Sequence, residues 1–140
     1  MRNDLSEIFT FLIIVALVIL ADRNEVIYGL WNTTAGNDGI LSVPGNDTGT
    51  CNPSEIPHNA FDQNSTTKHS SYGICNRSSY SLPQCGTNTG VYLTLNRDSS
   101  LLTSVQFLTA WTVPQRDPMS IPIEGSNQSP TALLLGSSWT

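Results

Sequence analysis

The chain has 140 residues, of which only 12% are charged, and its formal net charge is −5 at pH 7. This length suits a single domain with a modest core. The six lysine and arginine residues are scattered along the chain and form no patch that could neutralise phosphates, so the composition argues against a nucleic-acid partner.

An uncharged apolar run from Ile8 to Ala21 comes first in the chain. A membrane-spanning helix needs about 20 apolar residues, whereas the apolar core of a secretory signal peptide has about 7–15. The sequence therefore predicts a signal peptide over residues 1–21, cleaved after Ala21, and a product that is secreted or in the lumen of the endoplasmic reticulum. Because the residues before the run lack a positive bias, two alternatives stay open: an uncleaved membrane anchor at residues 8–21, or a buried apolar strand or helix.

Three segments of the next part, residues 22–113, carry the pattern of β-strands. Residues 25–31 are rich in β-branched and aromatic side chains, and residues 91–95 alternate along the strand. Residues 101–113 favour a longer strand because of their valine, threonine, phenylalanine and tryptophan content, with a helix as the alternative. We therefore expect residues 22–113 to form a β-rich glycosylated domain.

Polar segments separate and follow these strands. Residues 32–68 are rich in turn-forming residues and are predicted to form a long loop with one short strand at residues 39–43. Residues 114–140 contain four prolines and are predicted to be an irregular tail, with a short strand at residues 132–135. The predicted fold is mainly β: a small irregular antiparallel sheet or sandwich with long glycosylated loops, after an N-terminal signal helix.

Acceptor sequences for N-glycosylation are frequent after the apolar run. Five N-x-Ser/Thr sequons are present, which is more than the roughly three that chance would give at this composition. Their neighbours are turn residues, which favours exposed positions. The predicted glycosylation sites are Asn32, Asn46, Asn64, Asn76 and Asn127.

The three cysteines are an odd number. Cys75 and Cys85 are close in sequence, and Pro83 and Gly86, near one end of this segment, help the chain to fold back, so we expect a local disulfide that stabilises the fold by roughly 3 kcal/mol. Cys51 would then be unpaired, exposed in its loop and prone to form a covalent dimer. The alternatives are a pairing of Cys51 with either of the other two cysteines, or a reduced buried pair in a cytosolic protein.

No pattern of residues predicts catalysis or a cofactor. His58 and His69 are the only histidines, and their spacing from the cysteines matches no zinc-binding motif, so we expect no metal site and two exposed loop histidines. No nucleophile or phosphate-binding motif is present. Packing in the core is the predicted role of four aromatic residues, with a partner surface as the alternative: Tyr28, Trp31, Trp111 and Trp139.

The order of these features resembles a known arrangement. A signal-like run, a short β-rich opening, a lone cysteine in an asparagine-rich stretch and an Ile-Cys…Cys segment follow one another in the N-terminal part of betaretrovirus-like envelope glycoproteins, of the human endogenous type K and mouse mammary tumour kinds. Gly73 stands where that family would have proline. The resemblance covers roughly residues 10–95 and is carried by Leu12–Ala21, Val26–Trp31, Cys51, Ile74-Cys75 and Pro83-Gln84-Cys85-Gly86.

The resemblance implies a function as well as an origin. It implies a truncated surface subunit that binds a cell-surface receptor protein. Because the sequence has no furin-type site, fusion peptide or anchor helix, the product would have no fusion activity of its own. An unrelated small secreted or receptor-ectodomain glycoprotein with a binding role is the alternative.

Overall fold

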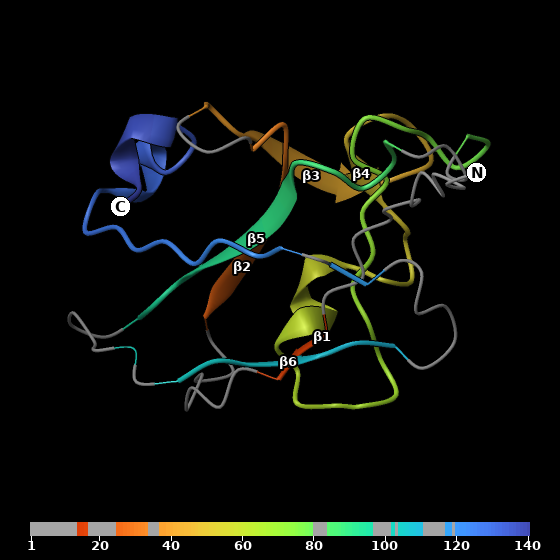
Figure 1. The fold of residues 1–140 in the computed structure, drawn as a ribbon, viewed down its shortest axis with the longest axis horizontal. Coiled ribbons are helices and arrows are strands. Elements are labelled where there is room, and N and C mark those ends of the chain that lie inside the picture. Colours follow the sequence, from red (N-terminus) through yellow and green to blue (C-terminus); the bar gives the residue numbers. More distant parts are fainter. Residues whose placement is uncertain are drawn as a thin grey trace, which may run out of the picture.

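The computed structural model describes residues 14–16, 25–33, 37–79, 84–96, 102, 104–110, 117–118 and 120–140. Strands and loops dominate this part of the chain, as predicted (Figure 1). Four strands form a sheet in the order β4-β3-β2-β5. They are β2 (Val26–Trp31), β3 (Ile40–Pro44), β4 (Thr50–Cys51) and β5 (Thr89–Thr94).

The antiparallel pair of β2 and β5 is the centre of the sheet. All six residues of one strand are opposite all six of the other, from Val26 opposite Thr94 to Trp31 opposite Thr89. Tyr28 and Tyr92 lie directly across from each other, and their rings stack with centroids 4.9 Å apart. Both strands were predicted, because their β-branched and aromatic residues fit a pleated, half-buried surface.

The short strand predicted after β2 is confirmed as β3, and the sheet is mixed rather than purely antiparallel. β3 runs antiparallel to β2 but parallel to β4, with Val43 opposite Thr50. Beyond β4, the 3-10 helix η1 (Pro57–Ala60) starts the loop that leads to the second cysteine.

The predicted strand at residues 132–135 is wrong. This part of the chain forms two 3-10 helices, η3 (Pro130–Ala132) and η4 (Gly136–Ser138). Pro130 favours the helical turn because its ring fixes φ near the helical value and because the first residue of a helix needs no N–H donor. The turn directs Leu133 into the core, where only 5% of its surface is exposed.

The core therefore contains residues from both the predicted β-rich domain and the tail. Leu30, Tyr92 and Leu133 form its buried centre, and Trp139 packs against them. The ring centroids of Tyr92 and Trp139 lie 5.7 Å apart, and the indole Nε1 of Trp139 donates a hydrogen bond to the carbonyl oxygen of Leu133 over 3.0 Å. Such burial is the dominant favourable term in folding a domain of this size.

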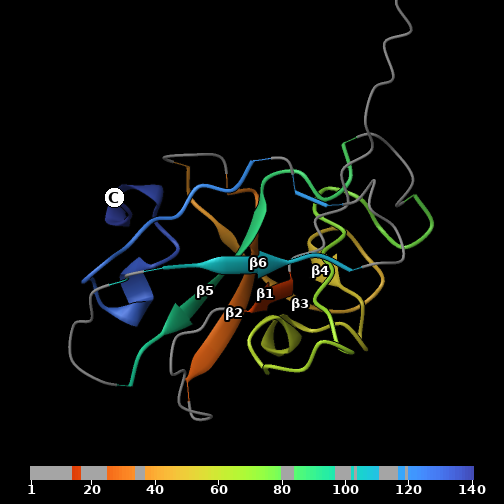
Figure 2. The same ribbon diagram turned by 60° about the horizontal axis from the view of Figure 1, so that its bottom comes forward.

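A second, two-stranded sheet includes three residues of the N-terminal apolar run, which was predicted to be a signal helix. β1 (Ile14–Ala16) pairs antiparallel with β6 (Gln106–Leu108), and Figure 2 shows the two strands side by side. The signal helix is thus absent at these three residues, and the rest of the predicted signal peptide lies outside the described residues. β6 is also much shorter than the strand predicted at residues 101–113. In the described part of the chain, no helix is long and apolar enough to cross a membrane.

Candidate functional site

Backbone pairing joins the segment around β4 to the segment that precedes Cys75. Cys51 forms an antiparallel bridge with Ser71, and the N–H of Gly49 donates to the carbonyl oxygen of Gly73 over 2.7 Å. Gly73 has φ of 55°, a value that the ring of proline cannot adopt. The proline expected from the resemblance would therefore need a different backbone at this position.

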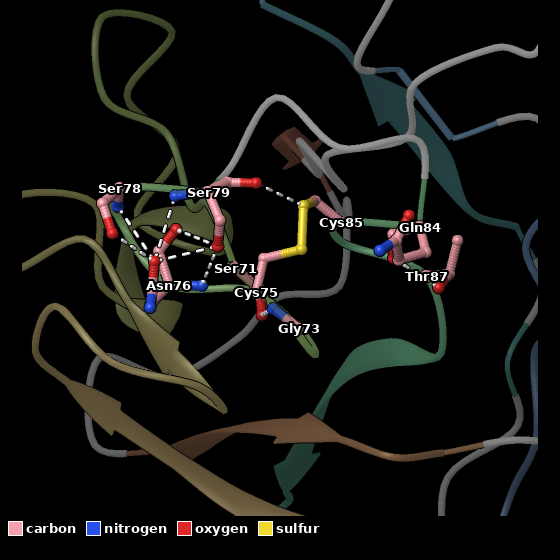
Figure 3. The surroundings of a disulfide bond; sticks show 9 residues. All are labelled: Ser71, Gly73, Cys75, Asn76, Ser78, Ser79, Gln84, Cys85 and Thr87. Carbon is pink, nitrogen blue, oxygen red and sulfur yellow. Dashed lines mark hydrogen bonds between the residues drawn. A yellow bond between two sulfur atoms is a disulfide. The ribbon is translucent and has the colours of Figure 1, made fainter.

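The predicted disulfide between Cys75 and Cys85 is confirmed (Figure 3). Their Cα atoms lie 5.2 Å apart, within the usual range for a disulfide. Both residues are buried, and Cys85 has no exposed surface. The bridge thus fixes a turn at the surface through sulfur atoms that lie inside the protein.

Asn76 organises the exposed side of this turn. Its Oδ1 accepts hydrogen bonds from the N–H and hydroxyl groups of both Ser78 and Ser79, at 2.7 to 3.0 Å. The second sequon in this region lies beside it, because the N–H of Arg77 donates to the carbonyl oxygen of Asn46 over 3.2 Å. Two predicted glycosylation sites that are far apart in sequence are therefore neighbours in space.

The other predicted acceptors also lie in loops. Asn64 has the same local arrangement as Asn76, since its Oδ1 accepts from the N–H and hydroxyl of Thr66 at 3.0 and 2.7 Å. Asn32 follows β2 directly and has φ of 60°. Asn76 is half-buried, and the exposed acceptors are Asn32, Asn46, Asn64 and Asn127.

Cys51 is unpaired, as predicted, but the prediction that it is exposed is wrong. Cys51 has no exposed surface, because the segment at Ser71 forms a β-bridge with it and covers β4. Burial raises the pKa of the Cys51 thiol, which lowers the fraction of reactive thiolate. The covalent dimer through Cys51 stays a prediction, and it would require this pairing to open.

The prediction of an exposed histidine is also wrong for His69, which is 2% exposed, whereas His58 is exposed. The Nδ1–H of His69 donates to the carbonyl oxygen of Glu55 over 2.9 Å. Burial lowers the pKa of His69, and the backbone and charge of Glu55 oppose this shift. The carboxylate of Glu55 accepts from the Ser70 hydroxyl and pairs with Lys68, whose Nζ lies 3.2 Å away. These contacts join the two ends of the loop that contains η1.

Candidate metal ligands do not converge where the structure describes them. Among those residues, no three histidine, cysteine, aspartate or glutamate side chains lie close enough together to hold a metal ion.

Sequence reasoning missed a cavity of about 170 Å³ between the sheet and the C-terminal segment. Leu30 and Leu133 contribute apolar surface to it, Tyr92 and Trp139 contribute aromatic rings, and Glu124 contributes a carboxylate. The only signal in the sequence was the aromatic and leucine content of residues 133–139. The packing of residues 133–139 against β5 could not be predicted without knowledge of the 3-10 turn that begins at Pro130.

The comparisons with known proteins give no relative: no protein-family model, curated protein or solved structure matches the chain. The function therefore has to be inferred from the chain's own residues.

Proposed function

We propose that the chain is a secreted or lumenal glycoprotein that acts by binding a cell-surface receptor protein, in the manner of a betaretrovirus-like envelope surface subunit. The observation that supports this most directly is the Cys75–Cys85 disulfide with a sequon, Asn76, in the turn it closes. Disulfides form and persist in oxidising compartments, which are the compartments that an N-glycosylated protein passes through. No enzymatic activity forms part of the proposal.

Expression of the full chain in mammalian cells tests whether the protein enters the secretory pathway and is glycosylated. We expect secretion into the medium, an N-terminus that follows Ala21, and a mass that falls in several steps on partial glycosidase digestion. Replacing Asn46, Asn64 or Asn76 by glutamine should each remove one step. Asn37→Gln is the matched control, because Asn37 is exposed but belongs to no sequon. A cytosolic product with Met1 intact and no glycosidase-sensitive mass would contradict the proposal.

The same experiment shows whether the mature protein keeps the pairing of β1 with β6. Cleavage after Ala21 would remove Ile14–Ala16 and leave β6 without its partner strand. A purified product that begins at residue 22 should then show fast hydrogen exchange at Gln106–Leu108. A secreted product that keeps residues 14–16, with slow exchange in β6, would support the buried-strand alternative for the N-terminal run instead.

Receptor binding is tested with the purified glycoprotein on intact cells. We expect saturable binding that treatment of the cells with a protease abolishes. Binding that never saturates, or that survives removal of cell-surface proteins, would refute a protein receptor. An unrelated secreted binding protein would pass the glycosylation test, and a fusion subunit encoded downstream in the genome would favour the retroviral origin over it.

A further inference from the structure

The cavity between the sheet and the C-terminal segment has a size and a lining that suit a small organic group. Its volume of about 170 Å³ is similar to that of an apolar cavity of about 150 Å³ that holds benzene. β2 and β5 form one side, and residues 121–139 form the other, so the cavity exists only when the tail is docked. The backbone N–H of Gly39 donates to the carbonyl oxygen of Leu134 over 2.8 Å, and this bond helps to hold the two sides together.

The chemistry of the lining selects for positive charge on an apolar stem. Glu124 is the only aspartate, glutamate, lysine or arginine among the described residues that line the cavity, and it is exposed to solvent. The Tyr92 ring stacks on Tyr28 and meets the Trp139 ring at a tilt of 58°, so it is largely covered, and the half-buried Trp139 contributes the more accessible aromatic ring to the cavity. The indole N–H of Trp139 is already bonded to the Leu133 carbonyl oxygen, so this ring offers its face rather than a donor. Aromatic faces and a carboxylate both attract an ammonium group.

We propose that this cavity binds a primary alkylammonium group of the size of a lysine side chain, presented by a partner protein. The four-carbon stem would contact the apolar surface of Leu30 and Leu133, and the ammonium would lie near Glu124 and the Trp139 ring. The protein's net charge of −5 favours the approach of such a group. The identity of the partner rests on the proposed receptor binding, but the binding of the ammonium group rests on the cavity alone.

Two probes and one neutral control test the proposal on the purified, folded chain. The probes are n-butylammonium and Nα-acetyl-lysine N-methylamide, and the control is n-butanol, a neutral molecule of nearly the same shape. The readout is the NMR chemical shift of the backbone amides of Gly90 and Gly136, which line the cavity. We expect both amines to shift these amides with dissociation constants on the order of 1 mM. The neutral n-butanol should bind at least about fivefold more weakly than n-butylammonium.

Three variants locate the binding. Gly90→Val places a side chain in the cavity, where an added Cβ would have 3.9 Å to its nearest neighbour, and it should weaken binding by about tenfold or more. Gly125→Val is its matched control, because an added Cβ there meets nothing within 4 Å and Gly125 does not line the cavity. Glu124→Gln should weaken the binding of both amines by about fivefold and leave n-butanol unaffected.

The outcomes separate this proposal from the proposed function. Equal binding of n-butanol and n-butylammonium, or no loss in Glu124→Gln, would refute the preference for positive charge even if Gly90→Val did not fold. Binding of n-butylammonium without the lysine derivative would refute a lysine side chain as the ligand. A glycosylated, secreted chain that binds neither amine would overturn this inference alone, whereas a cytosolic chain that binds both would overturn only the proposed function.

Discussion

Removal of the Cys75–Cys85 disulfide should lower the stability of the domain by an amount that its sequence separation sets. The two cysteines are 10 residues apart, and in the chain-entropy model a loop of this size stabilises the folded state by about 3 kcal/mol. Alanine is the suitable replacement because both positions are buried and serine would bring a hydroxyl into the interior. For a domain whose total stability is roughly 5–15 kcal/mol, the loss in Cys75→Ala/Cys85→Ala would be large.

Urea unfolding followed by tryptophan fluorescence measures this loss. With a slope of about 1–3 kcal/mol per molar urea, the unfolding midpoint should fall by about 1–3 M in the double variant. Reduction of the native chain should lower its midpoint by a similar amount and leave that of the double variant unchanged.

Two results would refute the reasoning. An unchanged midpoint in the double variant would show that the turn is held without the bridge, for example by the hydrogen bonds of Asn76. A fall on reduction in the double variant, in which Cys51 is the only cysteine left, would show that a disulfide between the Cys51 residues of two chains contributes. Peptide mapping without reduction distinguishes these cases, because a peptide that joins two copies of Cys51 would appear only in the second case.

Further variants and conditions test other contacts of the described fold. Gly49→Ala should cost about 1–3 kcal/mol of unfolding free energy, because Gly49 has φ of 74° and an added Cβ would lie 2.4 Å from the Trp31 ring. The control Gly125→Ala should change the unfolding free energy by less than about 0.5 kcal/mol. Equal urea midpoints for the two variants would contradict this prediction. Burial lowers the pKa of His69 below its usual 6.5, so below that pH the unfolded chain binds more protons than the folded chain. The urea midpoint of the native chain should therefore fall when the pH is lowered from about 7.5 to about 5. The same change of pH should lower the midpoint of His69→Asn by less. The Cys51 thiol should react with a thiol reagent much more slowly in the folded chain than in urea, and a fast reaction in the folded chain would contradict its burial.

The sequence predicted those features that depend on local pattern. The strands β2 and β5 follow from runs of β-branched and aromatic residues, and the Cys75–Cys85 disulfide follows from a short loop with turn residues. The pairing of Tyr28 with Tyr92 could not be predicted, because a run of apolar residues fixes a strand but not its partner or register.

The errors arose where a distant segment decides the environment of a residue. Cys51 stands in a polar, turn-rich stretch and looked exposed, yet the pairing with Ser71, which lies 20 positions later in the sequence, covers it. Leu133 looked like part of a strand, yet the 3-10 turn after Pro130 carries it into the core. In both cases the local sequence pattern did not determine burial, because packing against distant residues decides which side chains are buried.

Three of the five predicted glycosylation sites lie in a segment that does not form the proposed ligand site. Asn46, Asn64 and Asn76 all lie between residues 45 and 79, and none of the described residues that line the cavity comes from this segment. Glycans at these three positions would therefore extend from loops that do not form the cavity, so they and a bound partner could be present together. Asn32 differs, because it directly precedes Thr33, which lines the cavity. Asn32 is thus an acceptor at which a glycan would compete with a partner that places a lysine side chain in the cavity.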